Sequence, residues 1–262
     1  MTDATLPAGS LPGLGTPGKP TFGTWVKLPT LETLELLAHA GLDFVVIDLE
    51  HSPLTLESAY MLVVVAQSMD MVAFVRVPDR SGSHVQRVLD AGADGILVPQ
   101  VTSVEQAEQA IAQMTFAPKG VRGMGITSRA GRWGLLGKAY LRTDDRVVKA
   151  IQVEDLATLQ NIEPLLDLPG LSAAFIGMGD LTMSSGLASS SAEIGDAVDE
   201  LINHCHRRSL PLGTAVGDAA LAAQAVEQGY SFILVSNDTT MFAKTASQLG
   251  TDLAALRRGS PS

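Results

Sequence analysis

The sequence contains a single cysteine, Cys205, so it can form neither an internal disulfide nor a thiol-rich zinc site. No apolar run approaches the roughly 20 residues that a membrane-spanning helix needs. Basic residues are few, 18 against 28 acidic ones, and no basic stripe interleaved with aromatics is present, which argues against nucleic acid as a partner. The start of the chain has neither a basic flank nor an apolar stretch for secretion, so we expect a cytoplasmic protein without membrane contact.

What is present is a chain of 262 residues, 46% of them hydrophobic, which is long enough for one large core. Residues 1–20 are rich in Pro, Gly, Ser and Thr, and we expect a flexible tail there, followed by one domain over 21–262. Gly13-Leu14-Gly15 in the tail is similar to a phosphate-binding loop, but no strand precedes it and no helix follows, so the motif is rejected.

From residue 22 onward, short apolar runs alternate with amphipathic stretches. The runs predict strands at 22–26, 44–47, 72–75, 95–98, 148–153, 173–176, 212–215 and 232–235. Helices are predicted at 31–40, 56–68, 84–91, 104–113, 196–208, 219–228 and 240–256, with Gly250 as a point where the last one can break. This alternation predicts an α/β fold, a (β/α)₈ TIM barrel, rather than an open doubly wound sheet, whose dinucleotide fingerprint is missing.

The connection between the fourth and fifth predicted strands is unusually long. It holds one helix and then a stretch at 116–138 that is rich in Gly and Arg. Loops of this length in compact domains are usually functional or disordered. We expect this one to present guanidinium and backbone N–H groups to an anion.

Two carboxylates follow neighbouring predicted strands, and both would lie on the rim where a parallel barrel keeps its chemistry. Glu154 closes the fifth strand and Asp180 follows the sixth. Either one alone could cap a helix, and Asp155 is the alternative candidate for that task. Together, Glu154 and Asp180 favour a site for one hard divalent cation such as Mg²⁺ or Mn²⁺. Gln152 lies on the same strand face as Glu154 and can reach the same ligand.

A histidine and an arginine follow two earlier strands. His51 alone would be an ordinary polar loop residue, but Asp48, Glu50 and Asp90 are candidates to hold one imidazole nitrogen and raise the basicity of the other. Arg76 follows four apolar residues, so its charge either pairs with a barrel carboxylate or meets an anionic ligand. No lysine ends a predicted strand convincingly, which argues against a Schiff-base mechanism.

These motifs, in this order, resemble the HpcH/HpaI aldolase family, the metal-dependent class II pyruvate aldolases typified by 4-hydroxy-2-oxoheptanedioate aldolase. The resemblance covers residues 22 to about 255. It is carried by Gly23-Thr24-Trp25, Ile47-Asp48-Leu49-Glu50-His51-Ser52-Pro53, Val75-Arg76-Val77-Pro78, Leu89-Asp90-Ala91-Gly92, Gly120-Val121-Arg122-Gly123, Ser128-Arg129-Ala130-Gly131-Arg132-Trp133, Gln152-Val153-Glu154, Phe175-Ile176-Gly177 and Gly179-Asp180-Leu181.

The resemblance implies a (β/α)₈ barrel that assembles as a homo-hexamer, a dimer of trimers, with the last helix exchanged between subunits. It implies Glu154 and Asp180 as the metal ligands. The chain departs from the family pattern at Met178-Gly179, where a Pro-Ala pair is common, and at Leu49, where several relatives have Gly. These departures bear on the substrate rather than on the reaction type.

The resemblance also implies a role for each of the remaining candidate residues. His51 is the base, Asp90 raises the proton affinity of that base, and Arg76 stabilises the enolate. Gln152 and the backbone of Gly179 contact pyruvate, and Asp180 lies beside them.

We therefore expect a class II aldolase that joins pyruvate, or a related 2-oxo acid, to an aldehyde and reverses that reaction. Two alternatives stay open at this point. One is a carbon–carbon lyase that acts on acyl-coenzyme A thioesters, of the related citrate lyase β or malyl-coenzyme A type. The other is a non-catalytic barrel that binds an anionic metabolite.

Overall fold

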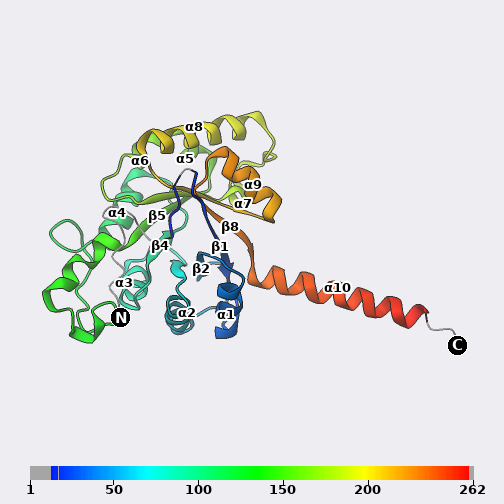
Figure 1. Cartoon of the computed structure of the whole chain (residues 1–262). Helices are drawn as coiled ribbons and strands as arrows, with labels where there is room; N and C mark the ends of the chain where they lie inside the picture. Colours follow the sequence, from blue (N-terminus) through cyan, green and yellow to red (C-terminus); the bar gives the residue numbers. More distant parts are fainter. Residues whose placement is uncertain (1–12, 17, 260–262) are drawn as a thin grey trace.

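The computed structural model of the chain describes residues 13–16 and 18–259, in which parallel strands and helices alternate along the sequence (Figure 1). The strands are β1 (Thr21–Val26), β2 (Phe44–Asp48), β3 (Val72–Arg76), β4 (Gly95–Val98), β5 (Val148–Val153), β6 (Ala173–Ile176), β7 (Leu212–Val216) and β8 (Phe232–Asn237). Each strand pairs with the next and β8 pairs with β1, which closes the sheet. The predicted single-domain (β/α)₈ barrel is confirmed.

The helices follow the predicted order with additions between β5 and β7. They are α1 (Leu31–His39), α2 (Leu56–Ser68), α3 (Gly82–Asp90), α4 (Val104–Gln113), α5 (Leu156–Gln160), α6 (Glu163–Leu166), α7 (Met178–Ser185), α8 (Ala192–Arg208), α9 (Ala219–Gln228) and α10 (Asp238–Gly259), with 3₁₀ helices η1 (Arg132–Gly134) and η2 (Gly137–Arg146) before β5. Helix α10 runs unbroken through Gly250, so this glycine does not interrupt it. No helix in the described ranges is long and apolar enough to cross a membrane.

The strands are apolar along most of their length because both of their faces are covered. Outward-facing residues pack against the helices, and inward-facing residues, many of them aromatic, fill the barrel. Glycines on the strands leave room for the rings: a Cβ on Gly213 would lie 2.2 Å from Cε2 of Phe232, and one on Gly23 would lie 2.6 Å from Cδ2 of Phe44. The interior therefore depends on glycine where a ring crosses a strand.

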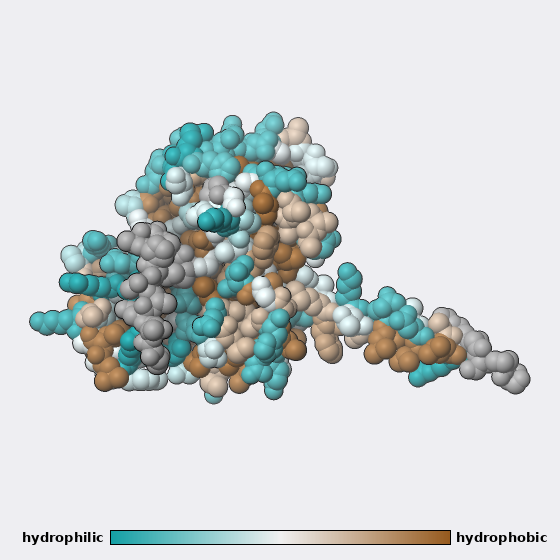
Figure 2. Space-filling model, in the orientation of Figure 1, coloured by the Kyte–Doolittle hydropathy of each residue, from teal (hydrophilic) through white to brown (hydrophobic). Residues whose placement is uncertain are grey.

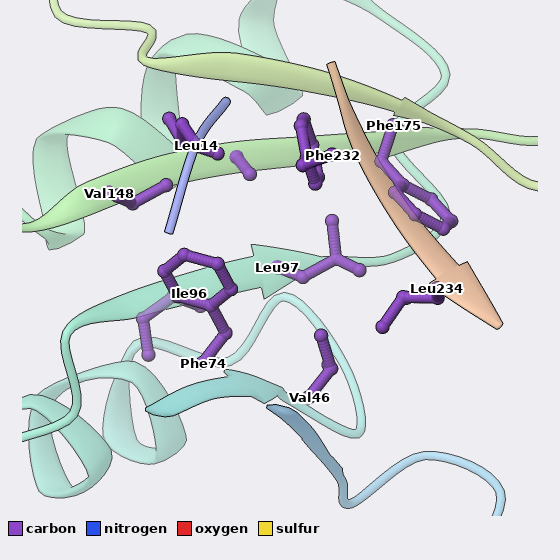
Figure 3. A pocket seen from close by; sticks show the side chains of 10 residues that line it. Leu14, Val46, Phe74, Ile96, Leu97, Val148, Phe175, Phe232 and Leu234 are labelled. Atoms are coloured by element: carbon purple, nitrogen blue, oxygen red, sulfur yellow. The ribbon is translucent and has the colours of Figure 1, made fainter. Parts of the chain in front are cut away.

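Residues before β1 reach the barrel at its N-terminal end. Leu14 shares an apolar cavity with inward-facing side chains of six strands, among them Phe74 and Phe232 (Figure 3). The hydroxyl of Thr21 donates to the carbonyl of Gly13 at 2.8 Å and fixes this segment. Residues 1–12, most of the predicted tail, lie outside the described residues. Leu14 closes the end of the barrel that faces away from the strand C-termini.

Helix α10 extends away from the barrel, on the side of β1 and β8 (Figure 1). Four large apolar side chains along it are exposed: Phe242, Leu249, Leu253 and Leu256. Figure 2 shows a continuous hydrophobic strip along the projecting part of this helix. Within one chain, this strip is not covered by the barrel.

Candidate active site

The C-terminal ends of the strands surround a cavity of about 240 Å³ that opens to solvent. Strands β1, β3, β5, β6, β7 and β8 contribute side chains to its wall, as does the start of α7. Its lining residues are Trp25, Lys27, Arg76, Gln152, Phe175, Gly177, Met178, Gly179, Asp180, Ala215 and Asn237. Four of the predicted site residues are thus brought together here: Arg76, Gln152, Gly179 and Asp180.

Arg76 is held rigidly at this rim. Its Nε donates to Oδ1 of Asp48 at 2.9 Å and its Nη2 donates to Oδ2 at 2.7 Å. Its Nη1 lies 3.1 Å from Oε2 of Glu50, and its guanidinium carbon lies 4.1 Å from the ring centre of Trp25. The sequence left two roles open for Arg76, pairing with a barrel carboxylate or contact with an anionic ligand. The two are compatible, because Arg76 pairs with buried carboxylates and also lines the cavity.

Asp48 is fully buried at the end of β2. Burial alone would raise the pKa of its carboxyl, but the hydrogen bonds and charge of Arg76, with those of Lys27, outweigh it and lower the pKa to about 2. Oδ1 of Asp48 also accepts from the backbone N–H groups of Glu50, at 3.1 Å, and His51, at 3.2 Å. One ionised carboxylate thus fixes both the arginine and the loop that carries the histidine.

Glu154 is nearly buried, at 8% exposure, and lies beside Gln152 on β5. The Nε2 group of Gln152 donates to one of its oxygens, and the backbone N–H of Gln100 donates to the other at 2.7 Å. Burial raises the pKa of Glu154; these two bonds oppose that effect, and the nearby charges of Glu50 and Asp180 add to it. A cation bound here would relieve this repulsion.

The donor set around Glu154 fits a hard divalent cation. The atoms that Glu154, Asp180 and Gln152 could offer to a metal are oxygens. Oε1 of Gln152 is buried with no hydrogen-bond partner among the described residues. Gly177 lets the strands approach: a Cβ there would lie 3.0 Å from Nε2 of Gln152 and 3.2 Å from Cβ of Glu154. Among the described residues, no three or more His, Cys, Asp or Glu side chains converge as a possible metal site. A cation held by Glu154 and Asp180 would thus have only two protein ligands, which leaves the other coordination positions for substrate and water.

Around this rim, acidic groups outnumber basic ones. Four carboxylates face two basic side chains: Asp48, Glu50, Glu154 and Asp180 against Lys27 and Arg76. The neighbouring Asp155 is a helix cap, as the sequence indicated: its Oδ1 accepts from the backbone N–H of Thr158 at 2.8 Å at the start of α5. The excess of negative charge is of the sign that a divalent cation balances.

His51 lies on the loop after β2, and its side chain is 55% exposed. Its Nε2 is 3.7 Å from Oε2 of Glu50, so of the three predicted partners Glu50 is the carboxylate that faces the imidazole within the chain. The backbone of this loop is tied down from two sides, because Nζ of Lys27 donates to the carbonyl of His51 at 3.0 Å. The base candidate thus has a fixed backbone and an accessible ring.

Asp90 lies at the other end of the barrel. It is the last residue of α3, and that helix returns the chain to the start of β4, away from the strand C-termini. Its Oδ1 accepts from the hydroxyl of Tyr140 at 3.0 Å and lies 3.6 Å from Nη2 of Arg122. A single chain therefore does not bring Asp90 to His51.

The Gly- and Arg-rich stretch 116–138 is also remote from the cavity, because it connects α4 to the start of β5. The guanidinium of Arg122 is buried, 4.5 Å from the ring centre of Phe116. Arg129 donates to the carbonyl of Ala91 at 3.0 Å. The expectation that this stretch presents its guanidiniums to an anion is not met by these two arginines.

Three residues of the rim were missed from the sequence: Lys27, Gln100 and Asn237. No strand in the described residues ends in a lysine, as predicted, but Lys27 directly follows β1 and lines the cavity. Gln100 has a left-handed backbone, with φ of 55°, and its Nε2 donates to Oε1 of Glu50 at 2.9 Å. Asn237 ends β8. Their common signal is a polar side chain at or just after an apolar strand.

Comparisons with known proteins agree with this arrangement. The family model described as HpcH/HpaI aldolase/citrate lyase matches residues 21–245. The chain is 31% identical over 230 residues to 2-dehydro-3,6-dideoxy-6-sulfogluconate aldolase of Pseudomonas putida, which covers 87% of this chain and 90% of that protein. It is 30% identical over 241 residues to 4-hydroxy-2-oxo-heptane-1,7-dioate aldolase of Salmonella dublin, covering 91% and 92% respectively.

Solved structures give the same result. The crystal structure of an HpcH/HpaI aldolase/citrate lyase family protein from Burkholderia cenocepacia J2315 superposes with a TM-score of 0.84 at 29% identity, over 90% of this chain and 95% of that one. The similarity in sequence and in fold thus extends over nearly the whole chain. The chain is a carbon–carbon lyase that belongs to the HpcH/HpaI aldolase/citrate lyase family.

Proposed function

We propose that this protein is a metal-dependent class II aldolase that catalyses the reversible aldol addition of pyruvate, or a related 2-oxo acid, to an aldehyde. The observation that carries the proposal is that Arg76, Gln152 and Asp180 line one cavity, with Glu154 hydrogen-bonded to Gln152 and close enough to feel the charge of Asp180. It combines oxygen ligands for a cation with a fixed positive group for the developing negative charge.

Glu154 and Asp180 are the residues that we propose to hold the cation, Mg²⁺ or Mn²⁺. When bound, the metal supplies Lewis acidity to the carboxylate and keto oxygen of the 2-oxo acid. Gln152 and the backbone N–H of Gly179 contact the same substrate. Gly179 lies in the first turn of α7, where N–H groups have no partner within the helix and can face an anion.

Arg76 stabilises the negative charge that appears on the keto oxygen as the carbon–carbon bond breaks. Asp48, Glu50 and Trp25 hold its guanidinium in place before substrate arrives, so little reorganisation is needed during the reaction. In the cleavage direction, His51 removes the proton of the aldol hydroxyl, and the aldehyde leaves. Its exposed ring and fixed backbone suit that role.

Asp90 can act on His51 only from another subunit, because the two residues lie at opposite ends of one barrel. We therefore propose that Asp90 of a neighbouring subunit completes each site. Its carboxylate is held by Tyr140 and remains 22% exposed, so one oxygen is accessible from outside the chain. Mixing inactive His51→Ala subunits with inactive Asp90→Asn subunits should restore part of the activity, since some sites then receive both residues. No recovery in verified mixed oligomers would contradict this arrangement.

The assembly that we propose is a homo-hexamer, a dimer of trimers, in which α10 docks on a neighbouring subunit. The exposed apolar side chains of α10, Leu249, Leu253 and Phe242 among them, support an intermolecular contact. Light scattering at micromolar concentration tests the assembly, and a monomeric mass would refute it.

The proposed reaction is tested by incubating the protein with pyruvate, each of several divalent ions and a panel of aldehydes, and by following aldol product. Cleavage of acyl-coenzyme A thioesters is assayed beside it. Formation of aldol product supports the proposal. Cleavage of thioesters alone, or binding of pyruvate without turnover of any substrate, would replace it with the lyase or the sensor alternative.

A further inference from the structure

Lys27 occupies a position in the cavity to which the proposed mechanism gives no role. It directly follows β1, and it lines the wall of the cavity beside Ala215 and Asn237. Its backbone N–H donates to Oδ2 of the buried Asp238 at 2.9 Å, which fixes the point where the side chain starts. The residue is thus built into the site rather than carried on a free loop.

The ammonium group of Lys27 has two polar contacts among the described residues. Nζ lies 2.8 Å from Oδ2 of Asp48 and donates to the carbonyl of His51 at 3.0 Å. A lysine ammonium has three N–H donors, so these two contacts leave one for a ligand. The side chain is 23% exposed, which gives a ligand access. Asp48 does not depend on Lys27 for partners, because Arg76 already binds both of its oxygens.

Asn237, another residue of the lining, also presents hydrogen-bond donors to a ligand. Its Oδ1 accepts from the hydroxyl of Thr239 and from the backbone N–H of Thr240 at 2.8 Å. The remaining polar atoms of its side chain are the two N–H donors of the amide. Ala215, another residue of the lining, is small and leaves room. Lys27 and Asn237 therefore offer donors to the cavity, whereas Asp180 offers it carboxylate oxygens.

We propose that Lys27, assisted by the amide of Asn237, is a specificity-determining residue that binds an anionic group on the aldehyde substrate. The preferred substrates are then short aldehydes with a carboxylate or a sulfonate at the end remote from the reacting carbon. The inference rests on the proposed aldolase function, in which Glu154 and Asp180 hold the cation that binds the 2-oxo acid. A donor-only wall with one ammonium pairs best with such an anion.

The test compares succinic semialdehyde with butanal, two four-carbon aldehydes of which only the first carries a carboxylate, in addition to pyruvate. The wild type should prefer the anionic aldehyde in kcat/KM. The preference is measured as kcat/KM for succinic semialdehyde divided by kcat/KM for butanal. Lys27→Met should lower this ratio by about 10–100-fold, as expected for loss of one charge-assisted hydrogen bond, mainly by raising KM for succinic semialdehyde. Lys27→Arg should keep most of the preference. Lys19→Met, which removes an equal charge at the far end of the barrel, should leave the ratio unchanged.

A second variant avoids dependence on the Lys27 contacts with Asp48 and His51. Asn237→Asp keeps the acceptor oxygen that Thr239 and Thr240 use, but it replaces the amide donors with a negative oxygen. This variant should also lower the ratio of kcat/KM for succinic semialdehyde to that for butanal. Repeating the comparison with sulfoacetaldehyde distinguishes a sulfonate from a carboxylate as the preferred group.

The outcomes separate this inference from the proposed function. Turnover of both aldehydes by the wild type without preference would overturn the role of Lys27 and leave the aldolase assignment intact. Equal loss of both aldehydes in Lys27→Met would show that the lysine only positions Asp48 and the His51 loop. A wild type that forms no aldol product with any aldehyde would overturn the proposed function, and this inference with it.

Discussion

Asp48 and Arg76 are register partners at the ends of the adjacent parallel strands β2 and β3, and two hydrogen bonds of 2.9 Å and 2.7 Å join their side chains. The pairing places a buried anion directly beneath the cation that lines the cavity. Since Asp48 also accepts from the backbone of His51, the two candidate catalytic side chains are positioned by one carboxylate.

The first prediction concerns the pH dependence of stability. The pKa of Asp48 falls on folding from an ordinary 3.8 to about 2, so ionised Asp48 stabilises the fold at pH above 3.8 and this contribution is lost as the pH falls toward 2. It amounts to about 2 kcal/mol. Urea unfolding should therefore show that Asp48→Asn is less stable than wild type at pH 6 and that the difference shrinks by this amount near pH 2. Asp196→Asn, an exposed change on α8, is the control. A difference that does not depend on pH would contradict the assignment.

The second prediction concerns packing inside the barrel. A Cβ on Gly213 would lie 2.2 Å from Cε2 of Phe232, so Gly213→Ala should destabilise the fold by ~1–3 kcal/mol through overpacking. Gly195→Ala makes the same chemical change on α8, where nothing lies within 4 Å of the new Cβ, and it should stabilise the helix slightly. Denaturation midpoints measure both. Adding Phe232→Leu to Gly213→Ala should recover part of the loss, and equal midpoints for the two alanine variants would show that the ring moves aside without cost.

The third prediction concerns metal binding and uses two adjacent carboxylates. Loss of a residue that only hydrogen-bonds to a metal ligand typically lowers metal affinity by ~10–100-fold. Glu154→Gln removes a direct ligand and should therefore weaken Mn²⁺ binding by more than that. Asp155→Asn should bind Mn²⁺ as the wild type does, because Asp155 caps α5 and asparagine also caps helices. Titration calorimetry of both variants without substrate gives the comparison. Normal affinity in Glu154→Gln would remove Glu154 from the site.

The fourth prediction separates the roles of Arg76 and His51 by using oxaloacetate, whose decarboxylation gives the pyruvate enolate with no aldol hydroxyl to deprotonate. Arg76→Ala should slow aldol cleavage and decarboxylation alike, since both develop the same charge. His51→Ala should lose aldol cleavage by ~10²–10⁴-fold, yet retain much of the decarboxylation. Steady-state rates on both substrates decide the matter. Equal losses in His51→Ala with metal still bound would show that the histidine positions substrate or metal instead.

The fold could be predicted from the sequence because each barrel strand is buried on both faces and so appears as a short apolar run. Gly92 and Gly229, which follow α3 and α9, have φ of 89° and 102°, the left-handed backbone that commonly ends a helix. Helix α7 was missed because it is short and includes Gly179 in its first turn. Gly250 does not break α10, because one glycine costs a helix only about 1 kcal/mol.

Much of the candidate site also followed from the sequence, since Arg76, Gln152 and Asp180 are brought to one cavity. Asp90 shows the limit of such reasoning. Its motif resembles that of the family, but α3 ends on the side of the barrel away from the His51 loop, which no local pattern records. Lys27 shows the opposite limit. It lies directly after a predicted strand, which is a signal in itself, but a role for this lysine is evident only from its contacts with Asp48 and His51.

We propose that this protein is an aldolase whose turnover depends on a divalent metal held by Glu154 and Asp180. The most direct test is the rate of pyruvate release from a 4-hydroxy-2-oxo acid before and after dialysis against excess chelator, followed by addition of Mg²⁺ or Mn²⁺. Chelation should abolish pyruvate release and the added ion should restore it, while Glu154→Gln should stay inactive under every condition. Full turnover in excess chelator would show that the reaction needs no metal.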